Sequence, residues 1–569
     1  MTMMSGAQMV VRTLEDLGVD HLFGYPGGAV LDIYDALLES TKIKHILGRH
    51  EQGVAHAADG YARSTGKVGV CLVTSGPGAT NTVTAIATAY MDSIPMVILT
   101  GQVGTPLIGS DAFQEVDTVG ITRPIVKHSY LCQCALDIPK YIRQAFYLAS
   151  SGRPGPVVVD IPKDCVRPSL RFEYPEQEGP VRLRSYNPTK QGHRGQVKRA
   201  AKLLADSLRP IMLVGGGAQL SGAIDEVRAI AHRFNLPVTS TLMGLGVYPS
   251  TDKQFLGMLG MHGTYEANNA MDKADVVFAV GCSFDDRVTN NLSKFCPAAK
   301  IIHIDIDPAS ISKTVTADIP IVGDAKTVLN QFIEAFDEFD LHENEALKTW
   351  WAEIAKWRHI DCLNYAKNDT LIQPQEIIEA VYKATDGKAI IATDVGQHQM
   401  FTALYYKFDE PRKLLTSGGL GTMGYGFPAA IGAAVGNPDS TVCLFTGDGS
   451  FQMNIQELST CLEYGLPIKI FILDNSTLGM VRQWQRMFYK GHISSTNLNY
   501  NPDFVALAKA YGHEGIKVTS PKDLDSAIEK ALAMKDKLVI VDIACNTDAK
   551  VLPMQQGGGS MSDMFLSED

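Results

Sequence analysis

The chain has 569 residues, of which 45% are hydrophobic and 20% are charged. These proportions are ordinary for a packed globular protein and exclude a disordered chain, and the length predicts three or four domains of roughly 150 residues each. Acidic residues outnumber basic ones by 62 to 51, and the resulting net charge of −11 argues against a nucleic-acid backbone as the main partner.

The N-terminus leads directly into a helical pattern that contains Glu15 and Asp16, without the cationic start and apolar core of a secretory signal. No run of 18 apolar residues occurs, so the sequence predicts no membrane span. The ten cysteines are scattered and lack a CxxC spacing, which is typical of reduced thiols. Together these features predict a cytoplasmic protein.

A segment near the N-terminus is repeated near the C-terminus. Residues 70–78 (VCLVTSGPG) align without a gap with residues 442–450 (VCLFTGDGS), and the same offset of 372 places Pro95 on Pro467. Each copy has the pattern of a small-residue helix, an apolar strand ending in a glycine turn, a second helix, and a proline before the next strand. Continuous apolar strands alternating with helices predict a parallel sheet covered on both faces. The N-terminal and C-terminal thirds of the chain are therefore expected to share one architecture.

Three further apolar strands are predicted in the middle of the chain, at 210–217, 274–281 and 300–307. Each ends at glycine or aspartate, as strands do beside a ligand crevice in open α/β sheets. Polar segments at about 175–194 and 340–370 predict linkers. We therefore expect an α/β protein of three domains, each a mainly parallel sheet covered by helices, with limits at 1–170, 190–340 and 370–555.

Three patterns fail the requirements of the motifs they approach. Residues 419–424 match GxGxxG but lack the acidic residue about 20 positions later that a dinucleotide fold requires. His50 and His56 are six residues apart rather than four, which excludes a zinc-protease motif. Residues 60–67 have the wrong spacing for a phosphate-binding P-loop.

A Gly-Asp-Gly turn at 447–449 ends one apolar strand, and Asn475 ends the next, 27 residues after Asp448. In a parallel sheet both residues lie at the same edge, beside the N-terminus of the intervening helix. The glycines let the backbone approach a diphosphate, and Asp448 and Asn475 offer the hard oxygen ligands that Mg²⁺ prefers. By spacing alone, the tripeptide also fits a plain strand-to-helix turn.

This spacing resembles the signature of the thiamine-diphosphate enzymes, in which GDG is followed by asparagine after a gap in the upper twenties. That family usually has Asn-Asn at the second strand end, and Asp474 departs from it at the first position. The resemblance covers almost the whole chain, in the order of pyrimidine-binding, central FAD-binding and diphosphate-binding domains. It implies thiamine diphosphate and Mg²⁺ as cofactors, with Asp448, Asn475 and Thr477 as metal ligands.

The same resemblance implies which residues act on the thiamine cofactor. Glu51, in the segment RHEQGVAHAADG, would contact N1′ of the aminopyrimidine and favour the imino form that removes the C2 proton. Met423 would hold the bend between the two rings. By residue type alone, Glu51 also fits a surface position and Met423 a gap filler. Further implied cofactor contacts are Val395, Gln397, Gly421, Gly447, Gly449 and Ser450.

Longer matches resemble the acetohydroxyacid synthase (acetolactate synthase) branch of the family, in its biosynthetic form. They include FGYPGG at 23–28, TSGPGATN at 74–81, YMDSIP at 90–95 and GMVRQWQ at 479–485. The resemblance implies that pyruvate is decarboxylated on the cofactor and that the two-carbon unit passes to pyruvate or 2-ketobutyrate. This reaction belongs to valine, leucine and isoleucine biosynthesis.

Five residues are implied to act on the substrates. Trp484 would pack on the extra methyl group of 2-ketobutyrate, although an ordinary core tryptophan is the alternative by residue type. Arg287 would hold the acceptor carboxylate, a task that suits a guanidinium group. Phe113, Gln114 and Lys163 match further positions that line the family's active site, and we expect Gln114 and Lys163 to be catalytic.

The middle of the chain resembles the FAD-binding domain of this branch, in which FAD is structural. The usual Gly-x-Arg-Phe-Asp-Asp-Arg segment reads GCSFDDR at 281–287, so Ser283 replaces the first arginine. We therefore expect weaker retention of FAD rather than loss of binding. The implied FAD contacts are Arg153, Gly215, Gly216, Met261, His262, Gly263, Gly281, Asp286, Arg287, Asp305 and Asp324.

The resemblance also implies a homodimer or larger assembly, in which Glu51 and Asp448 of one site come from two chains, and a small regulatory subunit. Three alternatives stay open: pyruvate oxidase, the FAD-free catabolic acetolactate synthase, and a non-catalytic protein on a decayed enzyme scaffold. Residues 284–287 and Trp484 favour the biosynthetic enzyme. The joint presence of Glu51, Asp448 and Asn475 argues against decay.

Overall fold

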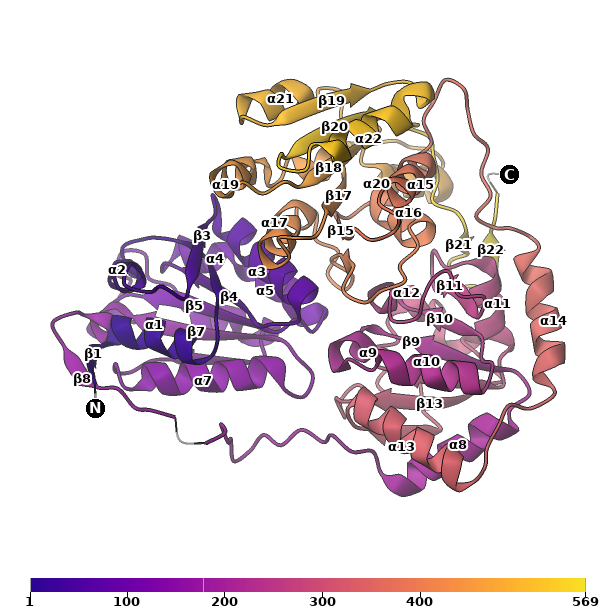
Figure 1. The fold of residues 1–569 in the computed structure, drawn as a ribbon, viewed down its shortest axis with the longest axis horizontal. Helices are drawn as coiled ribbons and strands as arrows, with labels where there is room; N and C mark the ends of the chain where they lie inside the picture. The colour runs from indigo at the N-terminus through magenta and orange to yellow at the C-terminus, as the bar shows by residue number, and fades with distance from the viewer. Residues whose placement is uncertain (1, 178, 568–569) are drawn as a thin grey trace.

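The computed structural model describes residues 2–177 and 179–567. Three six-stranded sheets, each parallel throughout and covered by helices, follow one another along the chain (Figure 1). This arrangement confirms the predicted α/β class. Among the described residues, no helix combines the length and the apolar character that a membrane crossing requires.

The N-terminal sheet has the strand order β3-β2-β4-β5-β7-β6. Its strands are β2 (His21–Tyr25), β3 (Lys44–Leu47), β4 (Gly69–Val73), β5 (Met96–Gln102), β6 (His128–Leu131) and β7 (Pro156–Pro162). Its helices are α1 (Gly6–Asp16), α2 (Leu31–Leu37), α3 (Glu51–Thr65), α4 (Pro77–Asn81), α5 (Val83–Met91), α6 (Thr118–Thr122) and α7 (Asp137–Ser150). The short strands β1 (Met3–Ser5) and β8 (Arg171–Glu173) form an antiparallel pair at the two ends of this part of the chain.

The C-terminal sheet has the strand order β16-β15-β17-β18-β20-β19. Its strands are β15 (Ile390–Thr393), β16 (Leu414–Leu415), β17 (Val442–Gly447), β18 (Lys469–Asp474), β19 (Glu514–Val518) and β20 (Val539–Ala544). Its helices are α15 (Pro374–Ala384), α16 (Gln397–Tyr405), α17 (Gly426–Gly436), α18 (Asp448–Phe451), α19 (Leu458–Tyr464), α20 (Gly479–Phe488), α21 (Phe504–Ala510) and α22 (Leu524–Ala533). Counted along the chain, both terminal sheets have the order 2-1-3-4-6-5, so the architecture predicted from the repeat is present.

The two repeats pack against each other through α3 and α17, which lie side by side at the centre of the molecule (Figure 1). A Cβ atom on Gly60 would lie 2.2 Å from the carbonyl oxygen of Ala429, and one on Gly432 would lie 1.8 Å from that of Ala57. Gly60 corresponds to Gly432, and Ala57 to Ala429, in the repeat. The close approach of the two backbones therefore depends on glycine at equivalent positions of both helices.

The central sheet has the order β11-β10-β9-β12-β13-β14, which is 3-2-1-4-5-6 along the chain, the order of doubly wound dinucleotide-binding folds. Its strands are β9 (Pro210–Val214), β10 (Val238–Ser240), β11 (Phe255–Met258), β12 (Val276–Val280), β13 (Lys300–Asp305) and β14 (Ile319–Val322). Its helices are α8 (Arg194–Asp206), α9 (Gly216–Ser221), α10 (Ile224–Arg233), α11 (Tyr265–Lys273), α12 (Asp286–Thr289) and α13 (Ala325–Glu338).

A segment between two predicted domains and a hairpin at the predicted C-terminal limit pack on the central sheet. The stretch predicted as a linker at 340–370 contains α14 (Leu347–Arg358), whose Trp350 is buried and donates its indole N–H to the carbonyl of Pro210 over 3.0 Å. The C-terminal hairpin of β21 (Met554–Gln555) and β22 (Met564–Phe565) returns to the same region and buries Met561 in its core. The domain limits themselves stay a prediction.

Candidate functional site

A cavity of about 1940 Å³ joins the carboxyl edges of the central and C-terminal sheets. Residues 90–93 and 150–154 of the N-terminal part of the chain line one side of it. Ligands of open α/β sheets bind at such edges, and a drug-sized ligand takes a pocket of about 300–1,000 Å³. The cavity therefore has room for more than one cofactor-sized molecule.

One end of the cavity lies at the Gly-Asp-Gly turn. Gly447 is the last residue of β17 and pairs with Leu473 of the neighbouring β18, so Asp448 and Asn475 follow adjacent strands. The predicted diphosphate and metal residues that line this end are Val395, Gln397, Gly421, Met423, Gly447, Asp448, Gly449, Ser450, Asn475 and Thr477. The structure thus brings together all the residues that sequence reasoning assigned to the C-terminal half of the site.

The oxygen atoms at this end form a small, hard donor set. Asp448 is 1% exposed, and its burial raises the pKa of the carboxyl group to about 7. The side-chain oxygen of Asn475 accepts the N–H of Thr477 over 3.1 Å, and the Thr477 hydroxyl donates to the carbonyl of Thr496 over 2.7 Å, so hydrogen bonds fix both residues.

Among the described residues, no group of three or more His, Cys, Asp or Glu side chains is placed to hold a metal ion. A cation at Asp448 would thus take few protein ligands and complete its shell elsewhere. This donor set fits Mg²⁺ shared with a diphosphate.

His398 of α16 is a residue of this wall that sequence reasoning missed. Its ring is buried, its Nε2 has no hydrogen-bond partner among the described residues, and it lies so near Gly447 that a Cβ there would be 3.1 Å from the ring. Burial lowers the pKa of His398 to about 3 and keeps the ring neutral. A bound polar group would satisfy this orphaned nitrogen, which supports a polar ligand at the Gly-Asp-Gly end.

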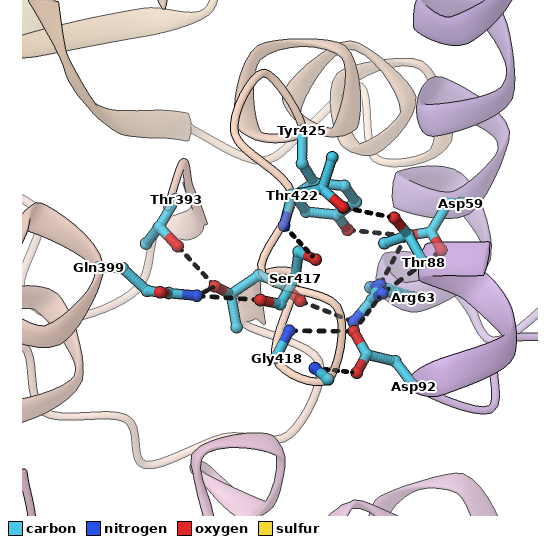
Figure 2. A network of polar contacts seen from close by, with 12 residues as sticks. Asp59, Arg63, Thr88, Asp92, Thr393, Gln399, Ser417, Gly418, Thr422 and Tyr425 are labelled. Atoms are coloured by element: carbon cyan, nitrogen blue, oxygen red, sulfur yellow. Dashed lines mark hydrogen bonds and ion pairs between the residues drawn. The ribbon is translucent and has the colours of Figure 1, made fainter. Parts of the chain in front are cut away.

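The loop that carries Gly421 and Met423 is fastened at its start to the N-terminal part of the same chain (Figure 2). Asp92 accepts the main-chain N–H groups of Gly418 over 3.1 Å and Gly419 over 2.7 Å. Arg63 of α3 donates to Asp92 over 2.8 Å and to the carbonyl of Thr416 over 2.8 Å. Both charged side chains are almost fully buried, so the ion pair and the loop amides satisfy each other.

The end of that loop is held by side chains of α3 and α5. The Tyr425 hydroxyl donates to Asp59 of α3 over 2.7 Å, and the hydroxyl groups of Thr88 and Thr422 are 2.8 Å apart (Figure 2). The intervening residues, including Met423, are left to line the cavity. None of these anchoring residues was predicted, because their partners are more than 300 positions away in the sequence.

The other end of the cavity lies between β9 and β12, where the strand order of the central sheet reverses. Gly216 follows β9 and Gly281 follows β12, and both line the cavity at this switch point, as in dinucleotide folds. Glycines at strand ends let a pyrophosphate approach the backbone, so the residues fit FAD. The predicted FAD contacts on the wall are Arg153, Gly216, Met261, His262, Gly281, Asp286, Arg287, Asp305 and Asp324.

Two predicted FAD contacts do not line the cavity. A Cβ atom on Gly215 would lie 2.2 Å from the carbonyl oxygen of Gly281, and one on Gly263 would lie 2.6 Å from the carbonyl carbon of Leu259. These glycines instead allow neighbouring backbones to pack closely.

Arg287 and Trp484 meet in the middle of the cavity. Arg287 belongs to α12 and Trp484 to α20, and the guanidinium carbon lies 5.8 Å from the centre of the indole ring. Trp484 is only partly buried, unlike the ordinary core tryptophan that its residue type allows. The pair offers a cation next to a flat apolar surface, which suits a small carboxylate with a methyl group.

Four predicted residues of the N-terminal domain lie on a different surface of the chain. Glu51, Phe113, Gln114 and Lys163 do not line the cavity. Glu51 and Lys163 follow the carboxyl ends of β3 and β7, and Phe113 and Gln114 lie in the longer segment between β5 and α6. Phe113 is 89% exposed, and Gln114 has a φ of 58° and packs its backbone against Gly76. Within one chain these four residues are therefore separate from the cavity that contains Asp448.

Glu51 opens α3 and is oriented by a neighbour that sequence reasoning missed. Its Oε2 atom accepts a hydrogen bond from Nδ2 of Asn81, at the end of α4, over 3.0 Å. Asn81 is the last residue of the motif at 74–81, but no role was assigned to it. The hydrogen bond determines where the Glu51 carboxyl group points.

Comparisons with known proteins agree with this arrangement. The models of the thiamine pyrophosphate enzyme family match residues 4–121 (N-terminal TPP binding domain), 197–332 (central domain) and 394–543 (C-terminal TPP binding domain). The chain is 58% identical over 570 residues to the acetolactate synthase large subunit of Haemophilus influenzae, covering 100% of this chain and 99% of the relative.

The large subunit of acetolactate synthase isozyme 3 of Escherichia coli is 56% identical over 571 residues, covering 100% of this chain and 99% of the relative. The acetolactate synthase of Mycobacterium leprae is 46% identical over 566 residues, covering 99% of this chain and 90% of the relative. The chain therefore belongs to the thiamine pyrophosphate enzymes, and thiamine diphosphate is its cofactor. Within them it is a member of the acetolactate synthase large-subunit family, which confirms the resemblance predicted from the sequence.

Proposed function

We propose that this chain catalyses acetolactate synthesis: pyruvate is decarboxylated, and its two-carbon unit is transferred to pyruvate or 2-ketobutyrate. The observation that carries the proposal is the cavity, in which the Gly-Asp-Gly end and the Arg287–Trp484 pair face one continuous space. Bound thiamine diphosphate supplies a carbon nucleophile and a sink for the electrons released on decarboxylation.

The residues of the C-terminal half would bind and orient the cofactor. Asp448, Asn475 and Thr477 would hold Mg²⁺ against the diphosphate, and the unpaired Nε2 of His398 would bind a polar group in the same region. Met423, on the loop anchored by Asp92, would press between the two rings of the cofactor. Rigid anchoring of such groups keeps the reacting atoms in register.

The residues of the N-terminal half-site would complete the chemistry from a second chain. Glu51, oriented by Asn81, would hold a proton at N1′ of the aminopyrimidine, and Gln114 and Lys163 would act from the same domain. The open surface around Phe113 supports a homodimer in which each cavity is closed by the half-site of the partner. A small regulatory subunit is a further proposed partner, since the relatives are named as large subunits.

Arg287 and Trp484 would select the second substrate. The guanidinium group would bind the carboxylate of the acceptor, and the indole face would contact its alkyl group. One additional methyl group in an apolar pocket is worth only about 1–3 kcal/mol, so 2-ketobutyrate would be preferred and pyruvate still accepted. FAD would occupy the end of the cavity at the central sheet, in a structural role, because the net reaction transfers no electrons to it.

The decisive experiment is product analysis with pyruvate and 2-ketobutyrate in competition, with thiamine diphosphate, Mg²⁺ and FAD omitted in turn. We expect both acetohydroxyacids, with 2-aceto-2-hydroxybutyrate in excess, and no product without thiamine diphosphate or Mg²⁺. Formation of peroxide in place of acetolactate would assign a pyruvate oxidase instead. Full activity without FAD would point to the catabolic type of enzyme.

A further inference from the structure

The Asp448 carboxylate has a hydrogen-bond partner from a later segment of the chain. Its Oδ2 atom accepts a hydrogen bond from Nδ2 of Asn501 over 2.6 Å. Asn501 lies in the segment between α20 and α21, 53 residues from Asp448, and was not predicted to belong to the site. The Oδ1 atom of Asn501 accepts a hydrogen bond from Gln452 over 3.2 Å, so both ends of this amide are tied.

The carboxylate of Asp474 contacts the same amide nitrogen. Oδ1 of Asp474, which occurs where the family usually has asparagine, is 3.4 Å from Nδ2 of Asn501. Two carboxylates facing one amide nitrogen determine its orientation, because the reversed amide would set its oxygen against both negative charges. Asp474 therefore helps to keep the Asn501 donor directed at Asp448.

The charge of Asp474 is only partly compensated. Its side chain is 13% exposed, and Nζ of Lys517 lies 3.5 Å from it but only 2.7 Å from Asp542. The nearest cationic group is thus shared between two carboxylates and sits closer to the other one. Asp474 therefore keeps a net negative charge next to Asp448, although its own carboxylate is not one of the proposed metal ligands.

We propose that Asn501 and Asp474 are positioning residues of the divalent-cation site at Asp448, an inference that rests on the proposed magnesium site. Asn501 occupies Oδ2 and leaves Oδ1 of Asp448 for the cation, and Asp474 orients Asn501 and adds to the local negative potential. Groups that orient metal ligands in this way typically contribute about 10–100-fold to metal affinity. A nearby uncompensated charge raises cation affinity through the Coulomb interaction.

The test uses the purified full chain, stripped of metal and supplied with saturating thiamine diphosphate. Binding of Mn²⁺ is followed by the electron paramagnetic resonance signal of the free ion. We expect Asn501→Ala to weaken Mn²⁺ binding by about 10–100-fold, and Asp474→Asn, which keeps the shape but removes the charge, by roughly three- to tenfold. Asn499→Ala, an exposed residue two positions before Asn501, is the matched control and should bind Mn²⁺ like the parent chain.

Two further readouts separate positioning from a structural role. The apparent KM for Mg²⁺ in acetolactate formation should rise in both variants, whereas kcat at saturating Mg²⁺ and the thermal unfolding midpoint stay near those of the parent. Unchanged Mn²⁺ affinity in Asn501→Ala, or a fall in kcat that saturating Mg²⁺ does not restore, would overturn the inference. Mn²⁺ binding needs no turnover, so weakened binding in a chain that forms no acetolactate would refute the proposed function alone.

Discussion

Glu51 and Asn81 show how the chemistry of a single residue depends on one neighbour. The carboxyl group of Glu51 is held by a 3.0 Å hydrogen bond from Asn81 and does not line the cavity. At the other half of the site, Asp448 is held in a similar way by Asn501. In both cases an amide determines where a carboxylate points, and the residue type alone does not.

We expect Glu51→Gln to keep the fold and to lower the rate of acetolactate formation by about 10²–10⁴, as for other positioned proton-transfer groups. The measurement is steady-state turnover of pyruvate at saturating cofactors. Glu39→Gln, an exposed position in the same part of the chain, should turn over like the parent. Activity of Glu51→Gln within threefold of the parent would show that its role is misassigned.

Ser283 stands where the resemblance predicts an arginine, and it lines the cavity at the FAD end. Because Ser283→Arg would restore a cationic contact, we expect this variant to retain FAD longer than the parent chain on dilution. The measurement is flavin released from the protein, followed by fluorescence over time. Equal release from both chains would remove Ser283 as the cause of weak retention.

Asp160 of β7 gives a pH dependence to the stability of the cofactor-free chain. Burial raises the pKa of its carboxyl group to about 7, although Thr100 and Gln102 donate hydrogen bonds to it. The folded chain therefore holds a proton that the unfolded chain releases near pH 4, so stability falls as the pH rises from about 4 to 7 and then levels off. Comparing thermal unfolding midpoints across this range, we expect Asp160→Asn to reduce the fall, and an identical profile would exclude the assignment.

At the scale of the elements, the pairing of α3 with α17 holds the two halves of the chain together. Gly60 and Gly432 let the backbones touch, and within one helix turn of Gly60 the side chains of Asp59 and Arg63 anchor the Met423 loop. The helix that begins with Glu51 thus also supports the loop of the diphosphate-binding half. The close approach of the two helices is a condition for the site as well as for the fold.

We expect Gly432→Ala to destabilise the chain, because the added Cβ atom would lie 1.8 Å from the Ala57 carbonyl oxygen and the helices must separate. Overpacking of this kind costs about 1–3 kcal/mol, which corresponds to a thermal midpoint lowered by roughly 2–12 °C. Gly557→Ala, at an exposed position with no atom within 4 Å of the new Cβ, is the control for calorimetry. Equal thermal midpoints for both variants would mean that the contact between α3 and α17 accommodates the added methyl group without loss of stability.

At the scale of the whole molecule, the residues proposed for one active site lie in two separate places on the chain. The cavity carries the cofactor and substrate residues of the central and C-terminal domains, and the carboxyl edge of the N-terminal sheet carries Glu51. The exposed Phe113 beside this edge is consistent with a surface that a second copy covers. The proposed function therefore requires an assembly of at least two chains.

Mixing two inactive variants tests this arrangement directly. Chains with Glu51→Gln and chains with Asp448→Asn should each be nearly inactive, whereas mixed dimers contain one site with both defects and one intact site. We expect acetolactate formation to return when the two variants are dissociated and reassembled together. No recovery in verified mixed dimers would mean that both residues serve the same chain.

The sequence by itself determined the α/β class, the duplicated architecture, and the Gly-Asp-Gly end of the site. These features follow from strand and helix periodicity and from residues at adjacent strand ends. Such patterns involve residues that are close together in the sequence, so the sequence alone shows them. Resemblance to the family added most of the predicted residues that line the cavity, including Arg287 and Trp484.

Only the tertiary structure decided which groups Asn81, Asn501 and Asp92 hydrogen-bond, and that Nε2 of His398 is left unpaired at the cavity. It also decided that Gly215 and Gly263 allow close backbone packing instead of lining the wall. Finally, it decided that Glu51 lies apart from Asp448 in one chain. The physical reason is that hydrogen bonds and close backbone contacts act over a few ångströms, between residues that folding brings together from distant positions.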